Sequence, residues 1–247
     1  MPMRRVLALL ALLLLVPAAV RAQDAPACGT PLDLLEAPAL PSFATGLLTR
    51  RLRVLAVGSA SVLSPGVSSE TASWSARLRE ILTNRYADLD LRIEVQGGRG
   101  LTAADQWRTI EEGMRRERRD LVIWQAGATE AVRSLPVEDL TEVLTRGLAA
   151  LHARGVDVVV MDQQFSRFLR TNADVEPYRD ALRIASAAGQ AALFRRYDMM
   201  RAWMDAGTID IERAPRAQRT VEVDRMNDCL AQAMALFLRN GSRLARR

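Results

Sequence analysis

Two hydropathy patterns alternate along the chain. Short runs that are apolar throughout, or at every second position, predict buried strands at 53–57, 91–95, 121–124, 156–161 and 191–194. Apolar residues spaced three or four apart predict helices at 70–85, 102–118, 136–154, 176–188 and around 229–238. Strands separated by helices of this length form right-handed crossovers. The sequence therefore predicts an α/β fold, a three-layer sandwich with a central parallel sheet covered on both faces.

Capping residues, prolines and glycines mark the ends of several predicted helices and strands. Thr102 is positioned to cap the helix that follows it, and Pro136 falls at a tolerated first-turn position of the next helix. Gly155 should end that helix before the strand at 156–161. The glycines from Gly97 to Gly100 predict a tight loop.

The first 50 residues divide into two parts that precede the alternating pattern. Arg4 and Arg5 stand before an apolar run from Val6 to Val16, and small residues lead to Ala22. This arrangement predicts a secretory signal peptide at 1–22, cleaved after Ala22, since its apolar core is shorter than the ~20 residues of a membrane span. Residues 23–50 lack a clear period and are expected to be an extended arm over a single α/β domain at 51–247.

Charge gives little support for a nucleic-acid partner. The formal net charge of +5 falls to near +2 once the expected signal peptide, with its three arginines and no acid, is removed. All the basic side chains are arginines, and they are mixed with acids, as at 113–120. Such runs are typical of solvated helix faces. We therefore expect neither nucleic-acid binding nor, after signal cleavage, a membrane span.

The chain has two cysteines, Cys28 in the arm and Cys229 in the closing helix. In a protein exported to the periplasm or secreted, a lone pair of cysteines is expected to be joined. A Cys28–Cys229 disulfide would tie the arm to the last helix.

One stretch, from Arg53 to Pro65, stands out as a place for chemistry. The apolar run of the strand stops at Gly58, and Ser59, Ala60 and Ser61 follow. Open α/β sheets place their ligands at the carboxyl ends of strands. An ordinary strand-to-helix loop with N-capping serines would have the same pattern.

Four segments in order resemble the SGNH (GDSL-like) hydrolase family. They are 57–61 (VGSAS), 96–102 (QGGRGLT), 120–130 (DLVIWQAGATE) and 224–235 (DRMNDCLAQAMA). The resemblance covers the chain from about Leu52 to the end and implies a flavodoxin-like SGNH hydrolase fold, ester or acyl hydrolysis and no cofactor. In the family a serine attacks, a histidine takes its proton, and an aspartate orients the histidine. A serine N–H, a glycine N–H and an asparagine amide form the oxyanion hole.

Carried over position by position, the resemblance implies a degenerate site. The nucleophile falls on Ala60, the oxyanion asparagine on Thr129, and the histidine on Asn227. Gly100 and Asp224 keep the family's residue types. The expected vestigial cleft comprises Ser59, Ala60, Ser61, Gly100, Gly127, Thr129, Glu130, Asp224 and Asn227.

The histidine count supports this interpretation without any alignment. The chain has one histidine, His152, which lies before the fourth strand and is expected to be a solvated helix-end residue. No metal ligands have the spacing of a known site. In the loop after the fourth strand, Gln163, Gln164 and Arg167 could line a pocket. Further along the chain, the side chains of Tyr197, Met199, Met200 and Trp203 are typical of core.

Three hypotheses follow from the sequence. The first is a non-catalytic member of the family, a pseudoenzyme that binds an acyl, glycan or protein ligand. The second is an active esterase that uses Ser59 or Ser61 with Asp224 or Glu222 as its base. The third is a structural protein of the cell envelope.

Overall fold

The computed structural model describes residues 27–246, so the expected signal peptide at 1–22 lies outside the described part of the chain. A parallel five-stranded sheet has the order β2-β1-β3-β4-β5 within these residues. The strands are β1 (Arg51–Ser59), β2 (Asp90–Gly98), β3 (Leu121–Gln125), β4 (Asp157–Met161) and β5 (Ala192–Phe194). Every strand pair is parallel, as the alternation of strands and helices predicts.

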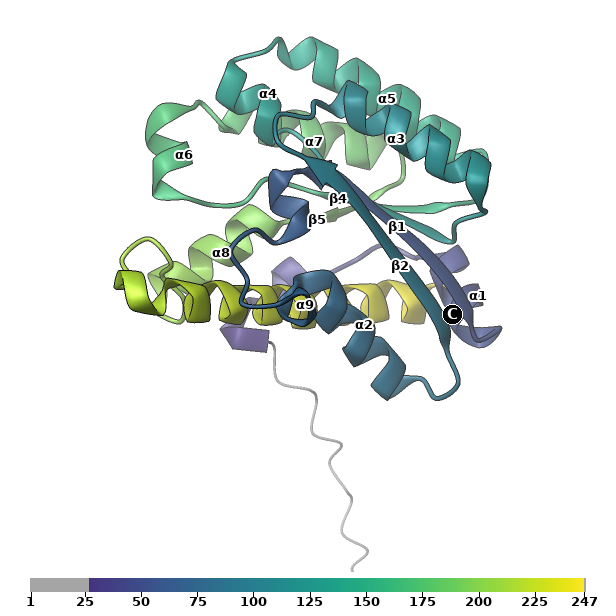
Figure 1. Cartoon of the computed structure of the whole chain (residues 1–247). Coiled ribbons are helices and arrows are strands. Elements are labelled where there is room, and N and C mark those ends of the chain that lie inside the picture. The colour runs from purple at the N-terminus through teal and green to yellow at the C-terminus, as the bar shows by residue number, and fades with distance from the viewer. Residues whose placement is uncertain (1–26, 247) are drawn as a thin grey trace, which may run out of the picture.

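Helices cover both faces of the sheet and make three layers (Figure 1). One face carries α1 (Pro41–Leu48), α2 (Trp74–Arg85), α8 (Arg196–Asp205) and α9 (Arg219–Leu244). The other carries α3 (Ala103–Arg116), α4 (Ala128–Arg133), α5 (Val137–His152), α6 (Arg167–Asn172) and α7 (Glu176–Ala188).

The central strand shows why two cores form. Alternate residues of a strand point to opposite faces. Val54 and Ala56 therefore pack toward α9, whereas Leu55 and Val57 pack toward α3 and α5. All four side chains are buried, which explains why this strand is apolar without alternation.

The arm differs from the extended segment that its sequence predicted. Residues 32–35 form a 3-10 turn and Pro41–Leu48 form α1, which packs on α9. Phe43 is buried in the core, and its backbone N–H donates to Asp157 Oδ2 at 2.8 Å. Because α1 is short, it depends for its stability on packing against α9 and not on its own helix propensity.

The Cys28–Cys229 disulfide is present, with the two Cα atoms 5.7 Å apart. It joins the arm to α9 across 201 positions of sequence. Hydrogen bonds reinforce the join, since Asn240 Nδ2 donates to the Leu35 carbonyl at 2.9 Å and the Leu40 N–H donates to the Gly241 carbonyl at 3.1 Å.

The capping prediction at Thr102 is confirmed, and the tight loop at 97–100 is corrected. Thr102 and Asp105 form a reciprocal capping box at the start of α3. Gly97 and Gly98, however, belong to β2 and pair with Gly58 and Ser59. A Cβ at Gly97 would lie 2.5 Å from Val62 Cγ1, so the glycine lets the turn after β1 lie on β2.

Candidate functional site

The serine turn, Ser59–Leu63, lies at the carboxyl edge of the sheet. β1 ends at Ser59, and Ala60–Leu63 form a 3-10 turn. Ser59 is buried, whereas Ala60 and Ser61 are half-buried and reached by solvent. Ala60 carries only a methyl group at the position where the resemblance expects a nucleophile. The two hydroxyls on either side of Ala60 are therefore the nucleophile candidates of this turn.

Gln125 holds both hydroxyls. This fully buried residue ends β3, next to β1 in the sheet. Its Nε2 donates to Ser59 Oγ at 3.1 Å, and its Oε1 accepts from Ser61 Oγ at 3.2 Å. Gln125 was not among the predicted site residues; its signal in the sequence is a polar side chain directly after the apolar run at 121–124.

Arg196 contacts the same turn from the other end of the sheet order, next to the edge strand β5. It opens α8 directly after β5, is only 2 % exposed, and its Nη1 donates to Ser61 Oγ at 3.1 Å. Burial lowers the pKa of Arg196 to about 10, and the Asp162 carboxylate opposes this effect. Its Nε is buried without a hydrogen-bond acceptor. Arg196 was not among the predicted site residues either; its signal in the sequence is a charged side chain shortly after the apolar run at 191–194.

The carboxylate of Asp162 already interacts with two groups other than Arg196. Asp162 directly follows β4, accepts a hydrogen bond from the Tyr197 N–H at 2.8 Å and pairs with Arg179 Nε at 3.5 Å. Burial raises the pKa of Asp162 to about 7, while the Tyr197 N–H and the Arg179 guanidinium oppose that rise. Arg179 also stacks on the Tyr197 ring, with its Cζ 4.1 Å from the centroid.

The expected oxyanion positions lie on the other side of the turn. Gly100 follows β2, and Arg133 from the end of α4 covers it: a Cβ at Gly100 would lie 2.7 Å from Arg133 Nη2. Gly127 precedes α4 and Thr129 is buried within it. Glu130 is also buried and accepts from the Ala103 N–H at 2.5 Å, so it joins α4 to the start of α3. Burial raises the pKa of Glu130.

Asp224 and Asn227 lie inside α9 and fix the segment that follows the serine turn. Asn227 Oδ1 accepts from the Trp74 N–H at 3.2 Å, and Asp224 Oδ1 accepts from the Ser68 N–H at 2.9 Å. Trp74 in turn donates from Nε1 to the Val62 carbonyl at 2.8 Å. The structure thus brings Asn227 close to the turn, with its side-chain oxygen bonded to backbone.

Two polar side chains of the loop after β4 form hydrogen bonds or ion pairs. Gln163 is buried and donates to the Val175 carbonyl at 3.3 Å. Arg167 forms a two-point ion pair with Asp210, at 3.0 and 2.9 Å, and also contacts Glu212. Gln164 is half-buried. Gln163 Oε1 is buried without a hydrogen-bond partner in the described chain, and none of the three side chains lines the pocket described next.

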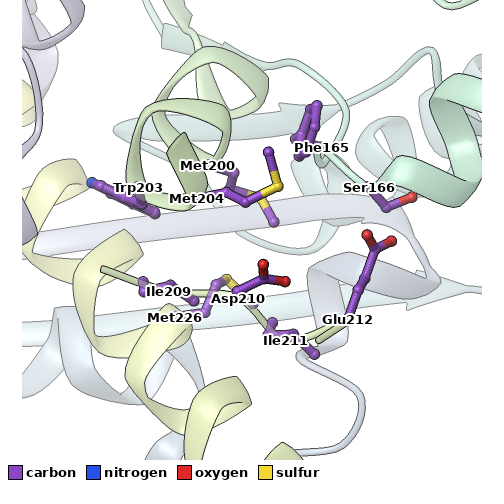
Figure 2. A pocket seen from close by; sticks show the side chains of 10 residues that line it. All are labelled: Phe165, Ser166, Met200, Trp203, Met204, Ile209, Asp210, Ile211, Glu212 and Met226. Carbon is purple, nitrogen blue, oxygen red and sulfur yellow. The ribbon is translucent and has the colours of Figure 1, made fainter. Parts of the chain in front are cut away.

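An apolar pocket lies between α8, the segment 209–212 and α9 (Figure 2). Met200, Trp203 and Met204 of α8 face Ile209 and Met226. The pocket encloses about 50 Å³, and Asp210 and Glu212 at its rim are paired with Arg167. Tyr197, Met199 and Trp203 are buried as the sequence analysis expected, while Met200 lines this pocket.

His152 is far from these groups. It is exposed at the end of α5, which leads into β4 at the amino edge of the sheet, opposite the serine turn. Across residues 27–246 no cluster of three or more His, Cys, Asp and Glu side chains could hold a metal ion. Over the same range, none of the helices has the length and apolar character needed to cross a membrane.

Comparisons with solved structures show a shared fold. TesA superposes with a TM-score of 0.57 at 16 % identity, covering 74 % of this chain and 97 % of that one. The esterase EstA from Pseudoalteromonas sp. gives 0.54 at 14 % identity, with 71 % and 94 % covered. A catalytic mutant of the acetylxylan esterase Axe2 from Geobacillus stearothermophilus gives 0.61 at 13 % identity, with 76 % and 94 % covered.

The sequence profile of the non-GDSL lipase-like family matches residues 27–244, nearly all of the described chain. No curated protein matches the sequence. The solved structures show the SGNH hydrolase fold that the resemblance implied, and the chain belongs to the non-GDSL lipase-like family.

Proposed function

We propose that this protein is an exported, non-catalytic member of its family that binds an acyl, glycan or protein ligand at the carboxyl edge of the sheet. One observation carries the proposal. Both hydroxyls of the serine turn are bonded to Gln125 or Arg196, and no histidine or carboxylate lies within hydrogen-bonding distance of them in residues 27–246. A serine is a weak nucleophile without an adjacent base.

The partners that are present cannot replace that base. An amide oxygen is too weak a base to take a proton from a hydroxyl, and a guanidinium has no lone pair to offer. Ala60 supplies no oxygen, and Asn227 cannot shuttle a proton as an imidazole does. These substitutions support binding without turnover.

An active esterase that uses Asp224 or Glu222 as base is the second hypothesis. Asp224 already accepts from the Ser68 N–H, and Glu222 lies 4.0 Å from the Arg225 guanidinium. Neither residue is bonded to Ser59 or Ser61. This arrangement favours the non-catalytic binding protein over the esterase. The third hypothesis, a purely structural envelope protein, differs from the first in that it would bind no small ligand.

The decisive experiment compares turnover with binding. Purified mature protein is incubated with p-nitrophenyl acetate and a fluorophosphonate probe, beside the Ser59→Ala and Ser61→Ala variants. We expect neither hydrolysis nor labelling. Labelling that disappears in one variant would establish an active serine. A melting screen with acyl esters and acetylated glycans should raise the melting temperature for a binding protein and leave it unchanged for a structural one.

Export is part of the proposal and has its own test. The pattern of residues 1–22 supports a cleaved signal peptide, and the disulfide is consistent with an oxidising compartment. Expressed at full length in a bacterial host, the protein should be recovered outside the cytoplasm with Gln23 at its amino terminus. Intact protein that keeps residues 1–22 in the cytoplasm would contradict export.

A further inference from the structure

Arg196 is a buried cation without a matching anion. The residue is 2 % exposed, and the only hydrogen bond of its guanidinium in the described chain is the one to Ser61 Oγ at 3.1 Å. No carboxylate in residues 27–246 comes within 4.0 Å of it, and its Nε has no acceptor. Buried charges are normally paired because the removal of a charge from water is costly.

The nearest acid does not fill this role. Asp162 attracts Arg196 electrostatically, yet its two oxygens serve the Tyr197 N–H and Arg179. Arg179 is itself shared with Glu176 and Asp198. Asp198 also pairs with Arg195, at 2.8 Å. These acids are therefore engaged by Arg179 and Arg195, and the guanidinium of Arg196 contacts only a hydroxyl in the described chain.

The hydroxyl that Arg196 contacts belongs to a partly exposed residue. This residue, Ser61, is half-buried and belongs to the serine turn. A second cation lies at the same edge: Arg133 covers Gly100 and attracts the Asp105 carboxylate without a direct ion pair in the described chain. Exposed Arg99 precedes Gly100. The surroundings of the turn thus favour a negatively charged group.

We propose that the ligand of this edge is a carboxylate, which neutralises the Arg196 guanidinium beside Ser61. This inference rests on the proposed function, since it names the ligand of the same non-catalytic site. A carboxylate matches the fork of donors on a guanidinium and carries the single negative charge that one buried cation lacks. Arg133 adds long-range attraction for the same group.

The apolar pocket of Figure 2 favours an alkyl chain as the rest of the ligand. Met200, which lines the pocket, is one helical turn beyond Arg196 on α8 and shares its face. A short acyl carboxylate would place its charge at Arg196 and its chain toward the methionines. A sugar acid has the same charge but no apolar chain. The test therefore measures an acyl carboxylate and a sugar acid separately.

The experiment measures binding of hexanoate and glucuronate to the mature protein by calorimetry and thermal melting. Neutral 1-hexanol and glucose, and sodium chloride at equal ionic strength, serve as ligand controls. We expect hexanoate to bind, glucuronate to bind more weakly, and the neutral compounds not to shift the melting temperature. Equal shifts by hexanol and hexanoate, or no shift by either carboxylate, would overturn the proposal.

Variants assign the effect to Arg196. Arg196→Gln should weaken hexanoate binding at least tenfold, whereas Arg146→Gln, on the exposed face of α5, should leave it unchanged. If Arg196→Gln does not fold, Ser61→Asp is informative, because it supplies the missing carboxylate. That variant should melt at a higher temperature and lose its response to hexanoate; an unchanged response would contradict the assignment. Ester hydrolysis by the unmodified protein would instead refute the proposed function, whatever the result with carboxylates.

Discussion

The side-chain oxygen of Asn227 accepts a hydrogen bond from the backbone N–H of Trp74 at 3.2 Å. Its Nδ2 donates to the Val223 carbonyl at 2.8 Å, so both ends of the amide are engaged. Asn227 is 1 % exposed. At the position where the resemblance expects a catalytic base, the chain thus has a residue that joins α9 to the start of α2.

Replacement of Asn227 should therefore lower stability. Asn227→Leu leaves the Trp74 N–H with Ser64 Oγ, at 3.3 Å, as its remaining acceptor. We expect the free energy of unfolding to fall by about 1–3 kcal/mol, measured by urea denaturation. Asp224→Asn is the matched control, because its amide oxygen can still accept from Ser68. An Asn227→Leu variant as stable as the parent would mean that this residue has no structural role.

Gly97 should not tolerate a methyl group. A Cβ there would lie 2.5 Å from Val62 Cγ1 and 3.0 Å from the Gly58 carbonyl oxygen. Gly97→Ala should cost about 1–3 kcal/mol of stability through overpacking. At Gly98 the nearest atom is Leu101 Cδ1 at 3.3 Å, on a side chain that can move, so Gly98→Ala should cost clearly less. Equal losses in the two variants would show that the serine turn does not pack closely on β2.

The disulfide should contribute strongly to stability. Cys28 and Cys229 are 201 positions apart, and the chain-entropy account assigns a closed loop of that size about 5 kcal/mol as an upper value. The Cys28→Ser, Cys229→Ser double variant should unfold at a clearly lower urea concentration, and reductant should lower the midpoint of the parent only. Two thiols that react with iodoacetamide in the untreated exported protein would contradict the pairing.

Asp157 should make stability depend on pH between about 4 and 6. Burial, together with the neighbouring Asp120, raises the pKa of Asp157 from 3.8 to about 6, while the N–H groups of Phe43 and Ser42 oppose the rise. The folded state then holds a proton that the unfolded state releases, so stability falls as pH rises through this window and levels off above it. Because a single proton is involved, the free energy of unfolding can change by at most ~1.4 kcal/mol per pH unit.

The test is urea denaturation from pH 4 to 7.5. Asp157→Asn keeps an acceptor for the Phe43 N–H and should flatten the profile. Asp210→Asn should leave the shape of the profile largely unchanged over this range, because the Arg167 guanidinium lowers the pKa of Asp210 below its ordinary value of 3.8 and its contribution is lost only at more acidic pH. A profile that Asp157→Asn leaves unaltered would mean that this carboxyl titrates normally.

Local signals in the sequence determine much of the fold. The helix expected at 176–188 matches α7 at both ends, because apolar spacing and the following glycine agree. The cap at Thr102 and the apolar runs of β1, β3 and β4 also depend on nearby residues and on burial, which composition reveals. The Cys28–Cys229 pair could be predicted because only one pairing was available.

Other elements depend on contacts between distant segments. The helix α1 is short and is stabilised where it packs on α9, and α8 was recognised from the sequence only as core side chains. The polar residues Gln125 and Arg196 are 71 positions apart and meet at Ser61 because their strands, β3 and β5, end at the same edge of the sheet. The sequence determines which strands and helices form, since those depend on neighbours along the chain. The tertiary structure decides which side chains surround the serines, because parallel strands bring residues together by sheet order and not by distance in sequence.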